Sequence, residues 1–373
     1  MTRLLEFFRA TESVAPIPSI PSIDGWRDHP IDAVDEPLVA LGQFSSFPNI
    51  TTDAIYFGER GSSPYKRGQL DGALLTVFCR ESIARNLQKV ADELPKGYAL
   101  KVWDAYRPKA VQDALYWDFV NKLMDEKGMS QAEAEEFAPT FVNMASDDPA
   151  KPSPHITGGA VDLTIIEINP DYVDEYDSLA KDIGMLRQKM IGKSAEQVDI
   201  IENFEYPAEM RRQHILRHHA KPIDVGAMFD ETQDISAVRY FEERLEAEET
   251  LTTQEVLQMQ HRRILQNLLQ KIGGFRAFAS EWWHVSAGDQ MAALQSGQVA
   301  QFGPVHLSKE NQRHEDMRRR HYQGTNILAS DSRQSQLRLA ASPTNERDKA
   351  LALDAAHRHG PLTTAKAVEA LTL

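Results

Sequence analysis

One short segment constrains this chain of 373 residues more than any other. Residues 153–162 read Ser-Pro-His-Ile-Thr-Gly-Gly-Ala-Val-Asp, which places His155 and Asp162 seven positions apart around a pair of glycines. Gly158 and Gly159 permit a turn with backbone angles that other residues avoid. The apolar residues that follow predict a strand over residues 161–168, so Asp162 is expected near the start of a strand and His155 in the loop before it.

His155 and Asp162 are two of three residues that we expect to bind one metal ion, the third being His284 in the run Glu281-Trp-Trp-His284. A catalytic zinc site keeps three protein ligands and leaves a fourth position for water. A further group must take the proton of that water and pass it to the leaving amine, and Glu281 is the candidate base. In a regular strand residues 281 and 284 face opposite sides, so a twist or bulge is required there.

A cation is expected from the run Asp104-Ala-Tyr-Arg107-Pro, which follows a strand predicted over residues 99–103. Attack on an amide builds negative charge on the carbonyl oxygen, and a fixed guanidinium such as that of Arg107 can stabilise it. Three metal ligands, a base and a cation together predict zinc-assisted hydrolysis of an amide bond.

These residues also carry a resemblance to a known family. Ser-x-His-x-x-Gly-x-Ala-x-Asp at 153–162, followed far downstream by Glu-x-x-His at 281–284, resembles the zinc D-alanyl-D-alanine dipeptidases and carboxypeptidases, and most of all the VanX-type dipeptidases. Asp-x-Tyr-Arg-Pro at 104–108 matches a third motif. Residues 225–230 resemble a fourth, Met-Gly-x-x-Phe-Asp, with Val225 in place of Met. The resemblance covers roughly residues 45–290.

The resemblance implies Zn²⁺ as the cofactor and assigns a role to each matching residue. It implies metal binding by His155, Asp162 and His284, base catalysis by Glu281, transition-state stabilisation by Arg107, and substrate contacts by Ser153 and Asp230. Asp230 would hold the free ammonium of the substrate, because a buried ammonium needs a carboxylate partner. The alternative for Asp230 is that it only caps the helix that follows.

One position departs from the family pattern. Members place a Tyr that touches the substrate amine near residue 50, where this chain has Ile50. Tyr56 and Tyr65 are the two residues that could replace it. We therefore expect weaker discrimination against substrates with a blocked amine.

The amino-acid composition limits which binding partners and which cellular compartment are expected. Asp and Glu number 55 against 41 Lys and Arg, a net charge of −14, which argues against nonspecific binding of nucleic acid or of an anionic membrane surface. The single cysteine, Cys79, excludes an internal disulfide and favours a reducing, cytoplasmic location. Cys79 is expected to be a buried core residue. No secretory signal and no membrane span is predicted.

The expected fold class is α+β, with a small, mainly antiparallel central sheet flanked by helices. We expect an extended N-terminal arm over residues 1–43, a catalytic domain over 44–300 and a C-terminal extension over 301–373. Residues 169–222 are expected to be an inserted helical segment. His214 and His218 within it stand one helical turn apart, but neighbouring arginines favour a solvated basic face over a metal site.

The predicted function is a metallopeptidase, most of all a dipeptidase of small peptides with D-residues. A different amide-processing role in a biosynthetic pathway stays open, as does an inactive binding protein. The presence of Glu281 and Arg107 argues against the last, because a binding protein need not keep them. A small peptide is the expected partner, and packing, oligomer contact and disorder remain open for residues 301–373.

Overall fold

The structure is a computed structural model that describes residues 2–43, 45–58, 70–140, 142, 144–190, 193, 195–231, 233–320 and 322. The fold is α+β, as the sequence predicts. Clustering of contacts divides the chain into two compact units. The first comprises Met1–Glu167 with Lys221–Asn311, and the second comprises Ile168–Ala220 with the described residues from Gln312 onward.

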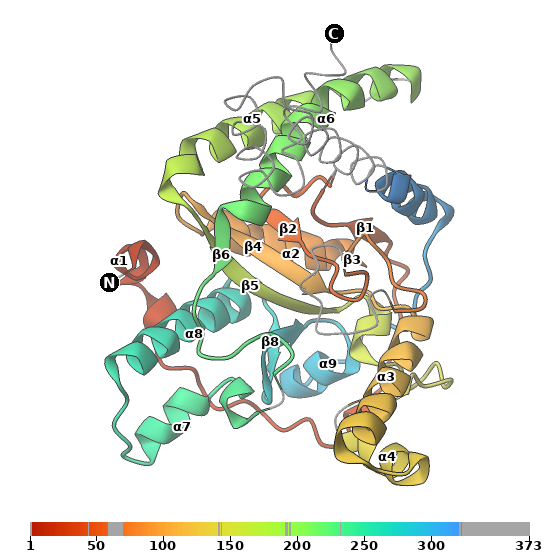
Figure 1. The fold of residues 1–373 in the computed structure, drawn as a ribbon, viewed down its shortest axis with the longest axis vertical. Coiled ribbons are helices and arrows are strands. Elements are labelled where there is room, and N and C mark those ends of the chain that lie inside the picture. Colours follow the sequence, from red (N-terminus) through yellow and green to blue (C-terminus); the bar gives the residue numbers. More distant parts are fainter. Residues whose placement is uncertain are drawn as a thin grey trace, which may run out of the picture. The chain divides into compact units, whose positions relative to one another are not determined.

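The centre of the first unit is a twisted sheet (Figure 1). Its strands lie in the order β2 (Ile50–Thr52), β4 (Tyr98–Asp104), β5 (Ala160–Ile168), β8 (Glu281–Ser286) and β7 (Arg276–Phe278), and β6 (Ala220–Pro222) also pairs with β5. β2 and β4 are parallel, whereas β4–β5, β5–β8 and β7–β8 are antiparallel. The prediction of a small, mainly antiparallel sheet is confirmed.

Two helices complete the core of this unit. Ile83 and Leu87 of α2 (Glu81–Asp92) and Leu265 of α8 (Thr253–Lys271) are buried in one apolar cluster with Leu100 and Leu163 of the sheet. Thr252 followed by Glu255 three places on is a sequence pattern that predicts a capping box, and α8 begins there. The Thr252 hydroxyl accepts from the Glu255 N–H while the Glu255 carboxylate accepts from the Thr252 N–H. The cap fixes where this long helix starts, and so which of its residues face the sheet.

The remaining elements of the first unit surround the sheet. They are α1 (Arg3–Phe8), η1 (Glu12–Val14), η2 (Trp26–Asp28), β1 (Leu38–Ala40), β3 (Phe78–Arg80), α3 (Lys109–Lys127), α4 (Gln131–Phe137), η3 (Ala138–Thr140), η4 (Pro154–Thr157), η6 (Asp234–Ser236), α7 (Tyr240–Glu246) and α9 (Gln290–Ser296). β1 and β3 form a separate antiparallel pair. The apolar residues between Leu74 and Leu94 recur at roughly helical spacing and predict one helix. This prediction is wrong at its start, because residues 78–80 pair with β1 and the helix begins only at Glu81. Cys79 is fully buried in β3, as a core residue should be.

The second unit contains α5 (Val173–Met190) and α6 (Ala195–His218), preceded by η5 (Pro170–Tyr172). The helices carry a buried ion pair, in which Arg212 donates to both oxygens of Glu209 at 2.9 Å, with the Tyr176 hydroxyl beside it. The expected helical content of this segment is therefore present, while its origin as an insertion stays a prediction. In the C-terminal extension, residues 309–320 are helical. The sequence also predicts a short helix over residues 347–357 and another over 361–373, and both segments lie outside the described residues.

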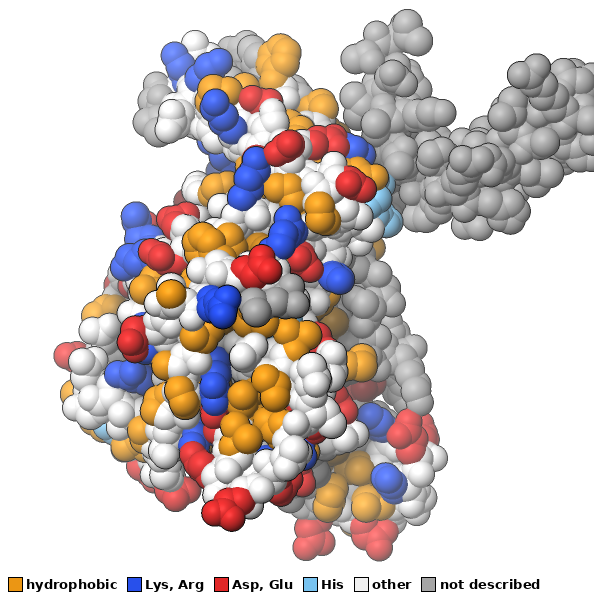
Figure 2. Space-filling model, turned by 90° about the vertical axis from the view of Figure 1, so that its left-hand side faces the viewer, with side chains coloured by type: hydrophobic (Ala, Val, Ile, Leu, Met, Phe, Trp, Pro, Cys, Tyr) orange, Lys and Arg blue, Asp and Glu red, His pale blue; other side chains and the backbone are white. Residues whose placement is uncertain are grey.

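Surface composition agrees with the mixed charge of the sequence. On the face in Figure 2, acidic and basic side chains are interspersed. In the part of the chain that the structure describes, no helix combines the length and apolar character needed to cross a bilayer.

Candidate metal centre

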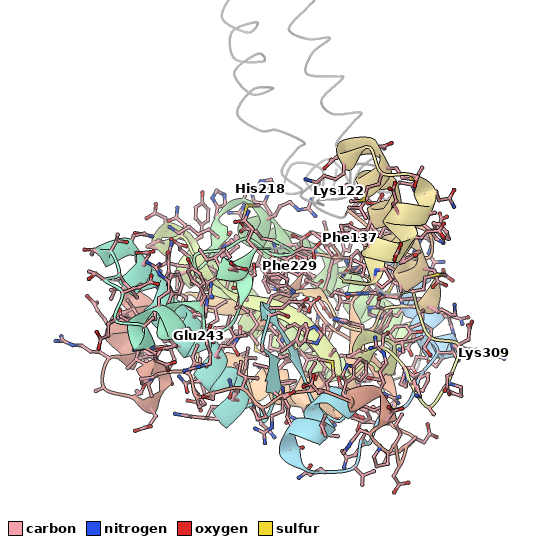
Figure 3. All side chains as sticks on the ribbon, turned by 90° about the horizontal axis from the view of Figure 1, so that it is seen from below. Lys122, Phe137, His218, Phe229, Glu243 and Lys309 are labelled. Carbon is pink, nitrogen blue, oxygen red and sulfur yellow. The ribbon has the colours of Figure 1, made fainter. Side chains whose placement is uncertain are left out.

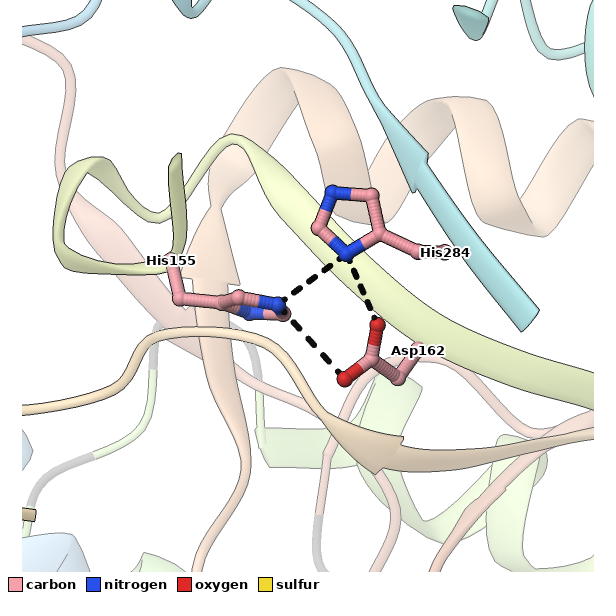
Figure 4. Close-up of side chains that lie close together, drawn as sticks. All are labelled: His155, Asp162 and His284. Carbon is pink, nitrogen blue, oxygen red and sulfur yellow. Dashed lines mark hydrogen bonds and ion pairs between the residues drawn. The ribbon is translucent and has the colours of Figure 1, made fainter. Parts of the chain in front are cut away.

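The three predicted metal ligands meet at one end of the central sheet (Figure 4). Asp162 of β5 lies directly opposite His284 of β8, so the two side chains share one face of the sheet. His155 enters from η4, immediately before β5. Asp162 Oδ1 is 3.0 Å from His284 Nδ1, Asp162 Oδ2 is 3.5 Å from His155 Nε2, and the two ring nitrogens are 3.2 Å apart.

Both glycines of the intervening turn are required by the geometry. Gly158 has a φ of +72°, and a Cβ there would lie 2.7 Å from Leu38 Cδ2. A Cβ on Gly159 would lie 2.7 Å from the carbonyl oxygen of Ala287, next to β8. The tight turn is what folds His155 back beside Asp162.

The donor atoms fit a tetrahedral metal ion. Zinc–nitrogen and zinc–oxygen bonds of about 2.0–2.2 Å place tetrahedral ligand atoms about 3.3–3.5 Å apart, and the three separations here are 3.0, 3.2 and 3.5 Å. His155 Nδ1 lies 2.8 Å from the Ala105 carbonyl oxygen, which only accepts, so this nitrogen carries the proton. His155 Nε2 therefore presents a lone pair to the centre.

Charge and burial also favour a cation at this point. His155, Asp162 and His284 are all at least 94% buried. Burial, with the charge of Arg107, lowers the pKa of His155 to about 3, so the ring is neutral and ready to bind a metal. Burial alone would lower the pKa of His284, but the hydrogen bond and charge of Asp162 outweigh it and raise that pKa. Within the described residues, no hydrogen-bond partner reaches His284 Nε2.

Glu281 reaches the same centre because β8 is irregular. Pairing between β7 and β8 jumps from Ala277–Val285 to Phe278–Glu281, which leaves residues 282–284 without regular partners on β7. This break is the irregularity that the sequence required, and it brings Glu281 Oε2 to 3.9 Å from His284 Nδ1. The side chain keeps 36% exposure. Burial, with the negative charges of Asp162 and Asp230 nearby, raises the pKa of Glu281 to about 7.

Arg107 lies beside Asp162. Its guanidinium is 3.8 Å from Asp162 Oδ2 and is held by Asp104, with Nε to Oδ2 at 2.8 Å, and by the Gln112 amide oxygen at 2.7 Å. The same Asp104 oxygen is 3.2 Å from His155 Nδ1. Asp104 therefore orients both a metal ligand and the cation, a role that the sequence motif contained but did not reveal.

Tyr56 is the aromatic residue beside this cation. The Arg107 guanidinium lies 4.9 Å from the centre of the Tyr56 ring, and burial raises the pKa of the Tyr56 hydroxyl. Both line a cavity of about 20 Å³, the size of one water molecule. Ile50 instead is fully buried in β2, opposite Leu100, so it belongs to the core. Tyr65, the other aromatic candidate, lies outside the described residues.

The two predicted substrate-binding residues take different positions. Asp230 is exposed in the loop after β6, and its negative charge is one of the lesser causes, after burial, that raise the pKa values of Glu281 and Tyr56. The capping alternative for Asp230 is not supported, because the next helix, η6, has Gln233 as its N-cap. Ser153 is the N-cap of η4, two residues before His155.

The histidine pair in the second unit does not form a comparable group. The His214 and His218 rings have centroids 4.7 Å apart, and the His219 ring lies 5.6 Å from His214. Among the described residues, three metal-ligating side chains converge at His155, Asp162 and His284 but not at this pair.

Sequence comparison yields one informative similarity. No family model matches the chain. The chain is similar to a protein named D-alanyl-D-alanine dipeptidase from Synechocystis sp., with 25% identity over 287 residues, which is 72% of this chain and 89% of that relative. The match supports the family resemblance that the four motifs carry.

Proposed function

We propose that this protein is a zinc-dependent hydrolase of small peptides, a dipeptidase of the D-alanyl-D-alanine type. The observation that carries the proposal is the convergence of His155, Asp162 and His284 in a buried centre, with the Glu281 carboxylate and the Arg107 guanidinium within 4 Å of two of these residues. The name of the Synechocystis relative supports the peptide substrate. The presence of Glu281 and Arg107 beside the centre favours an enzyme over an inactive binding protein, which would not need a base and a cation there.

The residues divide the chemistry between them. Zinc held by His155, Asp162 and His284 would supply a Lewis acid that lowers the pKa of water and polarises a carbonyl. Glu281 takes the proton of the attacking water and returns it to the leaving amine, for which a pKa of about 7 is well matched. Arg107, kept in place by Asp104 and Gln112, stabilises negative charge on the carbonyl oxygen.

Metal analysis combined with hydrolysis of free D-alanyl-D-alanine tests the proposal. We expect about one zinc ion per chain, lost in His284→Ala. Glu281→Gln should keep the zinc and lose about 10²–10⁴-fold in kcat. Glu243→Gln, an exposed carboxylate on α7 (labelled in Figure 3), is the matched control and should change neither. Full zinc occupancy in His284→Ala would overturn the metal assignment, and normal turnover in Glu281→Gln would overturn the assigned base.

A further inference from the structure

The loop that presents Asp230 is held at both ends by one side chain. The loop spans residues 225–237, of which 225–231 and 233–237 are described. Arg262 of α8 donates from Nη2 to the carbonyl oxygen of Val225 at 2.5 Å and from Nη1 to that of Ala237 at 2.6 Å. Both nitrogens also reach the Ile235 carbonyl oxygen at 3.0 Å. One planar guanidinium therefore joins the beginning of the loop to its end.

Arg262 is an unusual residue to find at this place. It is 1% exposed, and in the described part of the chain its hydrogen-bond partners are backbone carbonyl oxygens and not a carboxylate. Its guanidinium lies 4.9 Å from the centre of the Phe241 ring. Burial lowers the pKa of Arg262 to about 10, so the group stays charged near neutral pH. Burial of a charge without an ion-pair partner is costly, and the fork of donors offsets that cost only while all three carbonyls stay in place.

The start of the loop has further contacts with α8. His261 Nδ1 lies 2.8 Å from the Asp224 carbonyl oxygen, and the Gln258 amide donates to the Asp224 carboxylate at 3.0 and 3.1 Å. Gly226 has a φ of +92°, and a Cβ there would lie 2.8 Å from Phe241 Cζ. The loop thus leaves β6 along a path that α7 and α8 determine.

The middle of the loop is fixed to the sheet next to the metal centre. The Phe229 ring stacks on Trp103, which precedes Asp104, with centroids 4.5 Å apart, and it meets the edge of Trp283 at 5.4 Å. Figure 3 shows Phe229 among the crowded side chains over the strands, whereas Glu243 lies toward the outside. Asp230 follows with a φ of +61°, a left-handed conformation that Asp tolerates better than most residues. With its neighbour and both loop ends held, Asp230 has little freedom to move.

We propose that Arg262 is a positioning residue for substrate recognition: by closing the 225–237 loop it keeps Asp230 where a substrate ammonium binds. The inference rests on the proposed dipeptidase function. It adds a residue outside the site that would determine how well the protein distinguishes peptides with a free amine from peptides with a blocked amine. Displacement of a binding group by about 1 Å can cost about 10²-fold in rate. Lysine cannot replace the arginine, because its three donors radiate from one nitrogen and do not span both ends of the loop.

Arg263 is the matched control on the same helix. It is also largely buried and donates two hydrogen bonds at 2.7 and 2.6 Å, but to the Glu242 carboxylate on α7 and not to the loop. Arg262→Lys and Arg263→Lys therefore remove the same kind of group from neighbouring positions. The comparison separates general damage to α8 from release of the loop.

The experiment uses the purified full chain with bound metal. It compares D-alanyl-D-alanine with its N-acetyl form, as substrate or competitive inhibitor, and measures zinc content and amide hydrogen exchange of the loop. In Arg262→Lys we expect the KM for the free dipeptide to rise at least about tenfold. The affinity of the N-acetyl form and the zinc content should not change, and exchange within the loop should become at least about tenfold faster. Arg263→Lys should show none of these changes.

Three results decide the inference. Faster exchange with unchanged discrimination between the two peptides would overturn it, since Arg262 would then stabilise the loop without serving recognition. If the wild-type protein hydrolyses neither peptide, the proposed function fails. Amide hydrogen exchange of the loop then tests separately whether Arg262 holds the loop. Equal exchange rates in Arg262→Lys and Arg263→Lys would show that it does not. If Arg262→Lys does not fold, Phe241→Leu, which removes the ring under the guanidinium, should give the same change in KM, and a wild-type KM would overturn the inference.

Discussion

If zinc binds at this centre, its removal should lower the stability of the first unit by an amount that depends on the ratio of free zinc to Kd. Without a cation, His155 Nε2 and both Asp162 oxygens are acceptors, and the one hydrogen available between them is on His284 Nδ1. The three ligand atoms already stand at separations close to those of a tetrahedral site, so binding requires little rearrangement. At free zinc 100-fold above Kd, the ion should stabilise the fold by about 2.7 kcal/mol.

The measurement is thermal unfolding of chelator-treated protein as zinc is added back. A stabilisation of about 2.7 kcal/mol corresponds to a rise of roughly 5–10 °C in Tm for a unit of this size. His284→Ala should lose the zinc-dependent rise, while His306→Ala, which changes an exposed histidine that is not one of the three converging side chains, should keep it. An equal rise in wild type and His284→Ala would refute the reasoning, because the stabilising ion would then bind elsewhere.

The other predictions concern the groups around the metal. Glu281 must be ionised to act as a base, so kcat/KM should fall about tenfold per pH unit below its pKa of about 7. A bound cation that stabilises the carboxylate would move this midpoint to lower pH. A pH-independent kcat/KM from pH 5 to 8 would contradict the prediction. Arg107→Lys should keep zinc and lose mainly kcat, by about 10²-fold or more, because lysine cannot keep the paired contacts to Asp104, and an unchanged kcat would argue against the role. Asp230→Asn should raise KM for free dipeptides far more than for N-acetylated ones, with little change in Tm; equal effects on both peptides would remove Asp230 from the amine site.

Local sequence patterns were sufficient to predict a structural feature where that feature depends on one short segment. The Thr252 capping box predicted the start of α8, and the glycine pair predicted the turn between His155 and Asp162. Such features depend on backbone angles and hydrogen bonds within a few residues, so they can be recognised without knowledge of the rest of the chain. The helix expected from residue 74 failed for the opposite reason, since residues 78–80 pair with Leu38–Ala40, a contact that no local pattern contains.

The residue types of the centre are likewise a property of the sequence. Two histidines, an aspartate, a glutamate and an arginine in ordered motifs predict metal-assisted hydrolysis, because few other reactions need that set. Their roles as ligands, base and cation remain predictions that metal analysis and kinetics must test.

Tertiary structure alone decided how these residues act together. The break in β8 pairing brings Glu281 and His284 to one side. Asp104 contacts both Arg107 and His155. Arg262 joins the two ends of the 225–237 loop, in which Asp230 precedes it by 32 residues. The contacts of Asp104 with His155 and of Arg262 with the loop join segments that are distant in sequence, and their energy depends on burial and on donors meeting acceptors at about 3 Å. A sequence lists the donors and acceptors, but only the folded chain determines which of them meet.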